Sequence, residues 1–207
     1  MEYLDYYDED GNYLGYETRE VVHREGLWHK TVHNWLYTKD GKIIFQIRKD
    51  SNKFYTTSSG HVDKGETVEE AFARETKEEV GLIMDTSSAK LTAIVPWKMD
   101  KVKKDGSSMK DRAKAHVFIA LYEGDGSDFE FDPEEVLGVA MVDAKEALNL
   151  FERESGEIDA TIIQNGNPDN IIIEKKVDCR DFLVMPGETL LGKYGDVLRA
   201  VINEISA

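Results

Sequence analysis

The sequence predicts an α+β fold in which a mixed sheet lies between helices. Short runs with alternating or continuous apolar residues recur along the chain, which is typical of β-strands, and three longer segments carry features of helices. The composition, with 41% hydrophobic and 10% aromatic residues, is that of a globular chain and not of a disordered one. At 207 residues the chain is long enough for one domain with a sizeable core.

The strand-like runs follow one another in order. Residues 1–20 are acidic and rich in tyrosine, with a turn signal at Asp10-Gly11, so a short strand or hairpin is expected there. Residues 18–26 add one or two helical turns. The later strand-like runs cover residues 32–37, 42–48, 54–58, 91–97, 115–122, 136–142, 161–164 and 171–175. The last two flank residues 165–170, NGNPDN, which predicts a hairpin.

Three helices are predicted. The first begins after Thr67, which can cap it together with Glu70 three residues later, and it ends at Gly81, which supplies a left-handed stop. The second covers residues 144–153. The third covers residues 190–205, where apolar residues recur at helical spacing.

Three acids crowd one edge of the first helix. Glu75, Glu78 and Glu79 are spaced i, i+3 and i+4, so their carboxylates are neighbours. Like charges at this spacing repel one another, and partial burial increases the cost. A divalent cation with a preference for oxygen ligands would remove both penalties. The alternative is a solvated acidic face, which explains most Glu-rich helices.

The glycines and charged residues around these acids have a specific spacing. Gly60 is followed by Glu66, by the Arg74-Glu75 and Glu78-Glu79 pairs, and by Gly81-Leu82. This spacing matches the Nudix box at every charged and glycine position. The chain therefore resembles a Nudix hydrolase. The resemblance implies an α/β/α sandwich over about residues 30–155 of a single domain, 1–207, with residues 1–29 and 156–207 as additions. One position departs, since Thr76 replaces an aliphatic residue that packs the helix.

The resemblance also implies roles for the box residues. Glu75 and Glu79 would bind Mg²⁺, with Mn²⁺ as an alternative, and the carbonyl of Gly60 would complete the metal site. Glu78 would be a third ligand or order the attacking water. Arg74 would hold the acids in register. Magnesium suits this chemistry because it prefers carboxylate and water oxygens.

Two further assignments leave alternatives open. Glu66 is expected to be structural and to pair with Arg74, and a plain surface ion pair is an equal alternative. Members of the family take a fourth acid from a later loop, for which residues 132–135 are the natural place. Glu135 is the favoured base or extra ligand and Glu130 is a second candidate, while a solvated acidic loop is the alternative.

Positive charges gather in one segment of an otherwise acidic chain. Residues 98–114 carry seven of them: Lys98, Lys101, Lys103, Lys104, Lys110, Arg112 and Lys114. Lys98 and Arg112, together with Arg48, are the predicted contacts for substrate phosphates. A flexible, solvated loop is the alternative. Some of the aromatic residues could stack on a base, although most buried aromatics belong to a core; they are Trp28, Trp35, Phe54, Tyr55 and Trp97.

A second resemblance is to the isopentenyl diphosphate isomerase branch of the Nudix superfamily. His23, His29 and His61 occupy places comparable to histidines of that branch, and with carboxylates they could form a metal site. The isomerase uses a cysteine near the box turn, where this chain has Ser58 and Ser59. The single cysteine, Cys179, is distant in sequence and is expected to be an inert thiol. His33 and His116 belong to no recognised pattern.

These observations favour a metal-dependent hydrolase of a phosphoanhydride bond, in a nucleoside diphosphate linked to another group or in a related small organic diphosphate. The alternatives are isopentenyl diphosphate isomerisation and a non-catalytic nucleotide-binding module. The net charge of −15 argues against binding of a nucleic-acid polymer. The sequence lacks a membrane-spanning run and begins with acidic residues, so a cytoplasmic protein is expected. The segment 156–187 would border the pocket, make a homodimer contact, or be an inert surface feature.

Overall fold

A mixed β-sheet forms the centre of the protein. The computed structural model describes residues 1–102, 106, 108–166, 169–185 and 187–206. In this part of the chain the main sheet has the strand order β11-β10-β9-β4-β3-β8-β7, in which only β3 and β8 are parallel neighbours. Its principal strands are β3 (His29–Thr38), β4 (Lys42–Arg48), β7 (Lys90–Val102), β8 (Ser108–Tyr122), β9 (Val136–Asp143), β10 (Ile158–Gln164) and β11 (Ile171–Val177). Two short strands add to it, since β5 (Phe54–Tyr55) pairs with β4 and β6 (Ser58–His61) pairs with β3.

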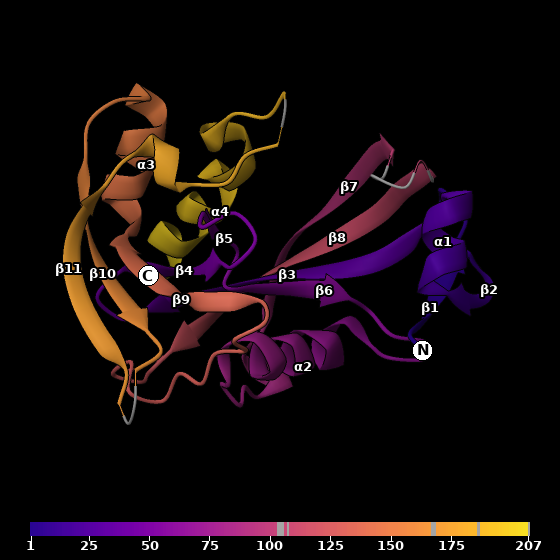
Figure 1. Cartoon of the computed structure of the whole chain (residues 1–207), viewed down its shortest axis with the longest axis horizontal. Coiled ribbons are helices and arrows are strands. Elements are labelled where there is room, and N and C mark those ends of the chain that lie inside the picture. Colours follow the sequence, from indigo (N-terminus) through magenta and orange to yellow (C-terminus); the bar gives the residue numbers. More distant parts are fainter. Residues whose placement is uncertain (103–105, 107, 167–168, 186, 207) are drawn as a thin grey trace.

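Helices cover both faces of this sheet (Figure 1). Helix α2 (Val68–Val80) lies on one face, and α3 (Ala144–Arg153) and α4 (Leu190–Glu204) lie on the other. At the end of the molecule remote from α3, β1 (Tyr3–Tyr7) and β2 (Tyr13–Thr18) form a separate two-stranded sheet that leads into α1 (Arg19–Glu25). The α+β class and the mixed sheet between helices are confirmed.

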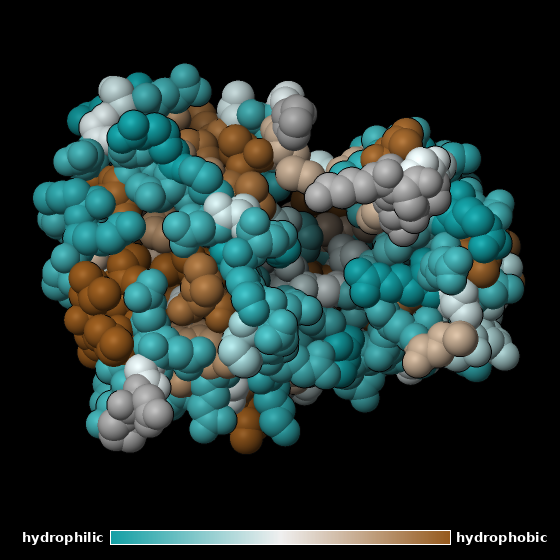
Figure 2. All heavy atoms as spheres, in the orientation of Figure 1, coloured by the Kyte–Doolittle hydropathy of each residue, from teal (hydrophilic) through white to brown (hydrophobic). Residues whose placement is uncertain are grey.

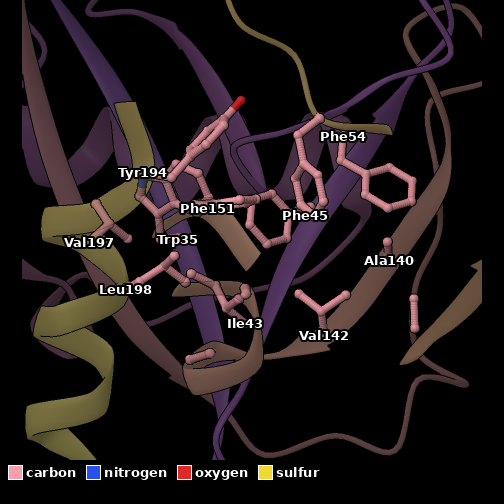
Figure 3. Close-up of a cluster of buried hydrophobic side chains, with 14 of the residues drawn as sticks. Trp35, Ile43, Phe45, Phe54, Ala140, Val142, Phe151, Tyr194, Val197 and Leu198 are labelled. Atoms are coloured by element: carbon pink, nitrogen blue, oxygen red, sulfur yellow. The ribbon is translucent and has the colours of Figure 1, made fainter. Parts of the chain in front are cut away.

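Two hydrophobic cores hold the layers together. On the α2 face, Phe72 packs into a cluster with Phe118, and both side chains are fully buried. On the opposite face, Tyr194 and Leu198 of α4 pack against Phe45 of β4 (Figure 3). Strand residues alternate between these cores because successive side chains of a strand point to opposite faces. Among the described residues, no helix combines the length and apolarity that crossing a bilayer takes.

The strands on either side of the basic segment are longer than the sequence predicts. The sequence predicts strands at 91–97 and 115–122. In the structure β7 continues to Val102 and β8 already begins at Ser108, and the two strands pair in register through most of the segment. The interpretation of residues 98–114 as a flexible loop is therefore wrong for the described part. Lys103 and Lys104 lie outside the described residues. Charged residues alternate along these strands, a pattern that hides their strand character when apolar runs are the only signal.

Candidate active site and histidine cluster

The acidic helix begins and ends as its sequence predicts. The Thr67 hydroxyl accepts a hydrogen bond from the backbone N–H of Glu70, and the Glu70 carboxylate accepts one from the backbone N–H of Thr67. This reciprocal pair satisfies two backbone donors that a helix start otherwise leaves free. Gly81 closes the helix in the left-handed conformation, with φ of 79°. Helix α2 is therefore held at both ends, and its acids are fixed relative to β6.

Gly60 provides room for Glu75. A Cβ atom added to Gly60 would lie 2.1 Å from Oε1 of Glu75, which is far inside van der Waals contact. A backbone without a side chain is therefore needed where β6 passes the helix. This close approach places the Glu75 carboxylate against the Gly60 backbone, the arrangement that the resemblance implies for a metal site.

Arg74 ties the acids together. Its Nε and Nη2 atoms donate to the two oxygens of Glu66 at 2.8 and 2.9 Å, a bidentate pair. Nη1 donates to Glu75 at 2.6 Å and to Glu78 at 3.0 Å, while Nη2 also donates to the carbonyl of His61 at 2.8 Å. The side chains of Arg74 and Glu66 are only 27% and 14% exposed, so this is more than a solvated surface ion pair.

Glu79 is a buried carboxylate at the centre of the site. One of its oxygens accepts hydrogen bonds from the side chain of Gln46 at 2.8 Å and from the backbone N–H of Ser59 at 3.2 Å. Burial, followed by the charges of Glu75 and Glu135, raises the pKa of Glu79 to about 8. Burial also raises the pKa of Glu75, although Arg74 lies beside it. The site thus holds more negative charge than its surroundings compensate, and a bound cation would relieve this.

The acidic loop reaches the end of the same helix. Backbone N–H groups of Glu130 and Asp132 donate to the carbonyls of Val80 and Glu79, both at 3.1 Å. Glu135 is exposed, and its charge contributes to the raised pKa of Glu79. The structure therefore brings Glu135 close to the box acids.

Thr76 belongs to a polar network that sequence reasoning missed. The Asn34 amide donates to the hydroxyls of Ser58 and Thr76 and to the carbonyl of Phe72, at 2.9, 3.2 and 3.1 Å. The Thr76 hydroxyl in turn donates to the Phe72 carbonyl at 2.7 Å. Asn34, Ser58 and Thr76 are all buried. The polar residue at the helix position that we expected to be aliphatic is thus matched by polar residues on β3 and β6, which a pattern confined to the box could not reveal.

Arg48 lies at the edge of a cavity beside the site. It forms a bidentate pair with Asp50 at 3.0 and 2.8 Å and lies over the ring of Tyr55, 5.6 Å from its centroid. The charge of Glu79 acts on Arg48. Arg48 is therefore near the box acids, as a phosphate contact would have to be.

Lys98 and Arg112 do not share that position. Lys98 pairs with Glu9 at 2.8 Å, and Arg112 pairs with Asp100 and donates to the carbonyl of Met99 at 3.1 Å. Neither side chain lines the cavity that Arg48 borders. The structure thus ties these two predicted phosphate contacts to the β7–β8 hairpin and the N-terminal extension.

Three histidines from separate elements meet beyond β6. His23 comes from α1, His29 from the start of β3 and His61 from the end of β6, and one ligand nitrogen of each lies within 4.8 Å of the others. Nε2 of His61 is 3.3 Å from Nε2 of His23, and Nδ1 of His61 is 3.1 Å from a carboxylate oxygen of Glu2. The short strand β6 therefore connects the two clusters, with Gly60 in one and His61 in the other.

The protonation of His29 suits metal binding. Nδ1 of His29 lies 3.1 Å from the carbonyl of Leu27 and can only donate there, which leaves Nε2 as an acceptor. Within the described residues, this Nε2 and Oδ1 of Asp111 are both buried without a hydrogen-bond partner, 3.6 Å apart. Burial and the neighbouring His61 lower the pKa of His29 to about 3, so the ring is neutral. Neutral imidazoles are common ligands of transition metals. The second ring nitrogen of such an imidazole usually donates to a carbonyl or a carboxylate.

The fold and the acidic site define a class, an α/β/α enzyme whose partly buried carboxylates suit a hard divalent cation. The NUDIX domain family model matches residues 27–163. The chain therefore belongs to the Nudix hydrolase family, which consists of pyrophosphohydrolases that generally use divalent cations.

Comparison with individual proteins agrees with this assignment. An uncharacterized Nudix hydrolase of Clostridium acetobutylicum is 29% identical, over 98% of each chain. An isopentenyl-diphosphate Delta-isomerase of Serratia proteamaculans is 27% identical, over 56% of this chain and 64% of that protein. A crystal structure of a Deinococcus radiodurans protein shares the fold, with a TM-score of 0.53 and 22% identity over 75% of this chain and 91% of the other.

Proposed function

We propose that this protein hydrolyses a phosphoanhydride bond in a nucleoside diphosphate linked to another group, or in a related small organic diphosphate, with Mg²⁺ or Mn²⁺. The observation that carries the proposal is the acidic cluster of α2: Arg74 holds Glu75 and Glu78, Glu79 is buried beside them, and Glu75 lies against the bare backbone of Gly60. The proposal includes a homodimer, and sedimentation velocity distinguishes it from a monomer.

The residues present fit a magnesium ion. Glu75, Glu78 and Glu79 would hold it together with the carbonyl of Gly60, and Mg²⁺ favours such oxygen ligands. The raised pKa values of Glu75 and Glu79 support this, because burial disfavours the negative charge of each carboxylate and a bound cation would offset that cost. When bound, the cation supplies charge neutralisation on the phosphate oxygens and acidifies a coordinated water.

The other side chains of the site have separate roles. Gln46 and the Ser59 backbone hold one oxygen of Glu79, and the other oxygen would bind the cation. Arg74 donates through Nη1 to both Glu75 and Glu78, which restricts the positions of the two carboxylates. Glu135, which is exposed and whose charge acts on Glu79, would accept the proton of the attacking water.

The proposal is tested with Glu79→Gln. Glutamine keeps the size of the side chain but removes the charge, so we expect metal-dependent turnover to fall by about a hundredfold or more while the fold persists. Wild type and variant are assayed with nucleoside diphosphates and triphosphates, nucleotide sugars, dinucleoside polyphosphates and isoprenoid diphosphates, with Mg²⁺ and Mn²⁺, and the products are identified. Unchanged turnover in Glu79→Gln would contradict the assignment. No turnover of any compound would favour a non-catalytic nucleotide-binding module.

The histidine cluster favours isopentenyl diphosphate isomerisation as a second candidate. His23, His29 and His61 with Asp111 fit a transition metal, because two buried ligand atoms face one another without other partners among the described residues. Against it, Ser58 and Ser59 stand where the isomerase has its cysteine, and Ser58 is engaged with Asn34. Incubation with isopentenyl diphosphate in heavy water, followed by NMR, decides: deuterium in the product supports isomerisation, and its absence excludes it.

A further inference from the structure

A large cavity lies between the sheet and the C-terminal segment. Its volume is about 610 Å³, which is in the range of small-molecule sites. Residues of β3, β8 and β7 form the floor, and residues between Leu183 and Ala200 form the opposite wall. Figure 2 shows the molecule hollowed between the C-terminal segment and the β7–β8 hairpin. The strands of the β10–β11 hairpin do not contribute to the lining, so the part of 156–187 that borders this cavity is the loop after it.

One end of the cavity lies beside the box acids. Arg48 and Tyr55 line it there. Tyr55 is the strand partner of Gln46, whose side chain donates to Glu79 at 2.8 Å. Tyr55 also comes shortly before β6, the strand that carries Gly60. A diphosphate held at the box would therefore place its organic group in the cavity.

The cavity has a small apolar floor and aromatic walls. Ala113 and Ala115 of β8 leave space above the sheet, and the rings of Tyr55 and Trp97 border that space. Nζ of Lys193 from α4 lies 5.0 Å from the centroid of Tyr55 and 5.8 Å from that of Trp97. Flat aromatic surfaces beside one cation suit a planar ring better than a flexible chain.

His33 is a polar residue on this floor. It points from β3 to the cavity side, and its ring meets the ring of Tyr55 at a centroid distance of 6.1 Å. No residue in the described part of the chain hydrogen-bonds to its ring nitrogens. Burial lowers the pKa of His33 to about 4, so at neutral pH the ring offers one donor and one acceptor. The ring is partly exposed to the cavity, so its hydrogen-bond partners there are water or a ligand.

On the basis of the proposed hydrolase activity, we propose that His33 is a specificity-determining residue that hydrogen-bonds the organic group of the substrate. That group is an aromatic heterocycle with donors and acceptors at its edge, as in a nucleoside diphosphate derivative, and not an isoprenoid chain. An isoprenoid chain would displace water from His33 and leave both ring nitrogens without partners, which disfavours its binding.

The test compares His33→Phe with His33→Gln. Phenylalanine keeps the contact with Tyr55 and removes both ring nitrogens, whereas glutamine restores one donor and one acceptor. Thr92→Val is the matched control, because Thr92 lines the same cavity but its hydroxyl already donates to the Val117 carbonyl at 3.0 Å. Binding of ADP, GDP, CDP, UDP and dimethylallyl diphosphate is measured by calorimetry in EDTA, so that neither metal nor turnover is needed.

We expect wild type to bind at least one nucleoside diphosphate more tightly than dimethylallyl diphosphate. His33→Phe should lose about tenfold or more of this affinity, with dimethylallyl diphosphate unaffected, and His33→Gln should recover part of it. With a cleaved substrate, His33→Phe should raise KM and leave kcat nearly unchanged. Equal affinity of His33→Phe and wild type, or a preference of wild type for dimethylallyl diphosphate, would overturn the inference.

Two safeguards keep the outcomes separate. If His33→Phe does not fold, Lys193→Met replaces it: a loss confined to nucleoside diphosphates supports the inference, and an equal loss or none opposes it. The metal-free titration does not depend on catalysis. If the protein hydrolyses diphosphates but the His33 substitutions do not change nucleotide affinity, only this inference is refuted. If the affinities are as expected but no compound is hydrolysed, only the proposed function is refuted.

Discussion

Gly60 and Glu75 illustrate how one residue limits another in this site. The carboxylate occupies the space that a side chain on Gly60 would fill. An atom cannot be added there without moving Glu75 or the strand, and both form part of the proposed metal site. The requirement for glycine is therefore one of close approach, and not one of backbone angle.

We expect Gly60→Ala to weaken Mg²⁺ binding and to reduce turnover by about tenfold or more, since a misplaced ligand loses its geometry. Overpacking should also lower the free energy of unfolding by about 1–3 kcal/mol. Magnesium titration by calorimetry and urea unfolding measure the two effects. Ser59→Ala, the neighbouring position on β6, serves as the control because its backbone N–H to Glu79 is kept. Wild-type magnesium affinity in Gly60→Ala would argue against a metal at this position.

Helix α2 depends on polar contacts as well as on apolar packing. Asn34 on β3 and Ser58 on β6 both bond to Thr76, so the helix is joined to two strands at a buried point one residue beyond Glu75. Buried hydrogen bonds fix orientation more narrowly than apolar contacts do. The network therefore positions the acids in addition to stabilising the helix.

Thr76→Val should destabilise the protein by about 1–2 kcal/mol, because it keeps the volume but leaves the hydroxyl of Ser58 and the amide of Asn34 with fewer partners. Thr161→Val, on β10 and outside this network, makes the same chemical change and should be nearly neutral. Urea unfolding of both variants provides the comparison. Equal stability of the two would show that the network contributes nothing.

The sequence predicts most accurately those elements whose ends are determined by residues close in sequence. The start of α2 at Thr67 and its end at Gly81 are correct, because capping and left-handed stops depend on side chains within a few positions. The lengths of β7 and β8 were underestimated, because charged residues such as Lys98 and Arg112 alternate with apolar ones and mask the strand. Pairing with a neighbouring strand decides such cases, and a single sequence does not display it.

The candidate site was predictable only in part for the same reason. The acids of α2 share one helix, so spacing alone placed Glu75, Glu78 and Glu79 together. His33 belongs to no pattern in the sequence. Its proposed role depends on a cavity lined by β3, β7, β8 and α4, which are far apart in sequence. The contact of Asn34 with Thr76 likewise depends on the packing of β3 against α2, which the sequence does not display.

On the scale of the whole molecule, the two clusters lie at the two sides of one short strand, and their ionisable groups respond to pH in opposite directions. Glu79 has a pKa raised to about 8, from 4.5. Above pH 4.5 the unfolded chain has lost this proton while the metal-free folded protein keeps it, so its contribution to stability declines as pH rises to about 8. In the histidine cluster His29 has a lowered pKa, so its effect is confined below pH 6.5, where acid favours the unfolded chain; His33, outside both clusters, behaves in the same way.

We therefore expect metal-free protein to lose stability between pH 6.5 and 8 through Glu79, and magnesium to reverse the loss. Because the cation binds the deprotonated carboxylate, its affinity should rise by about tenfold per pH unit below pH 8, with release of a proton. Thermal unfolding with and without Mg²⁺ across this range measures the first effect, and calorimetry in two buffers of different ionisation enthalpy measures the second. Glu79→Gln is the control and should abolish both. If the wild type and Glu79→Gln show the same pH dependence without metal, Glu79 does not hold the proton, and the electrostatic basis of the proposed metal site is wrong.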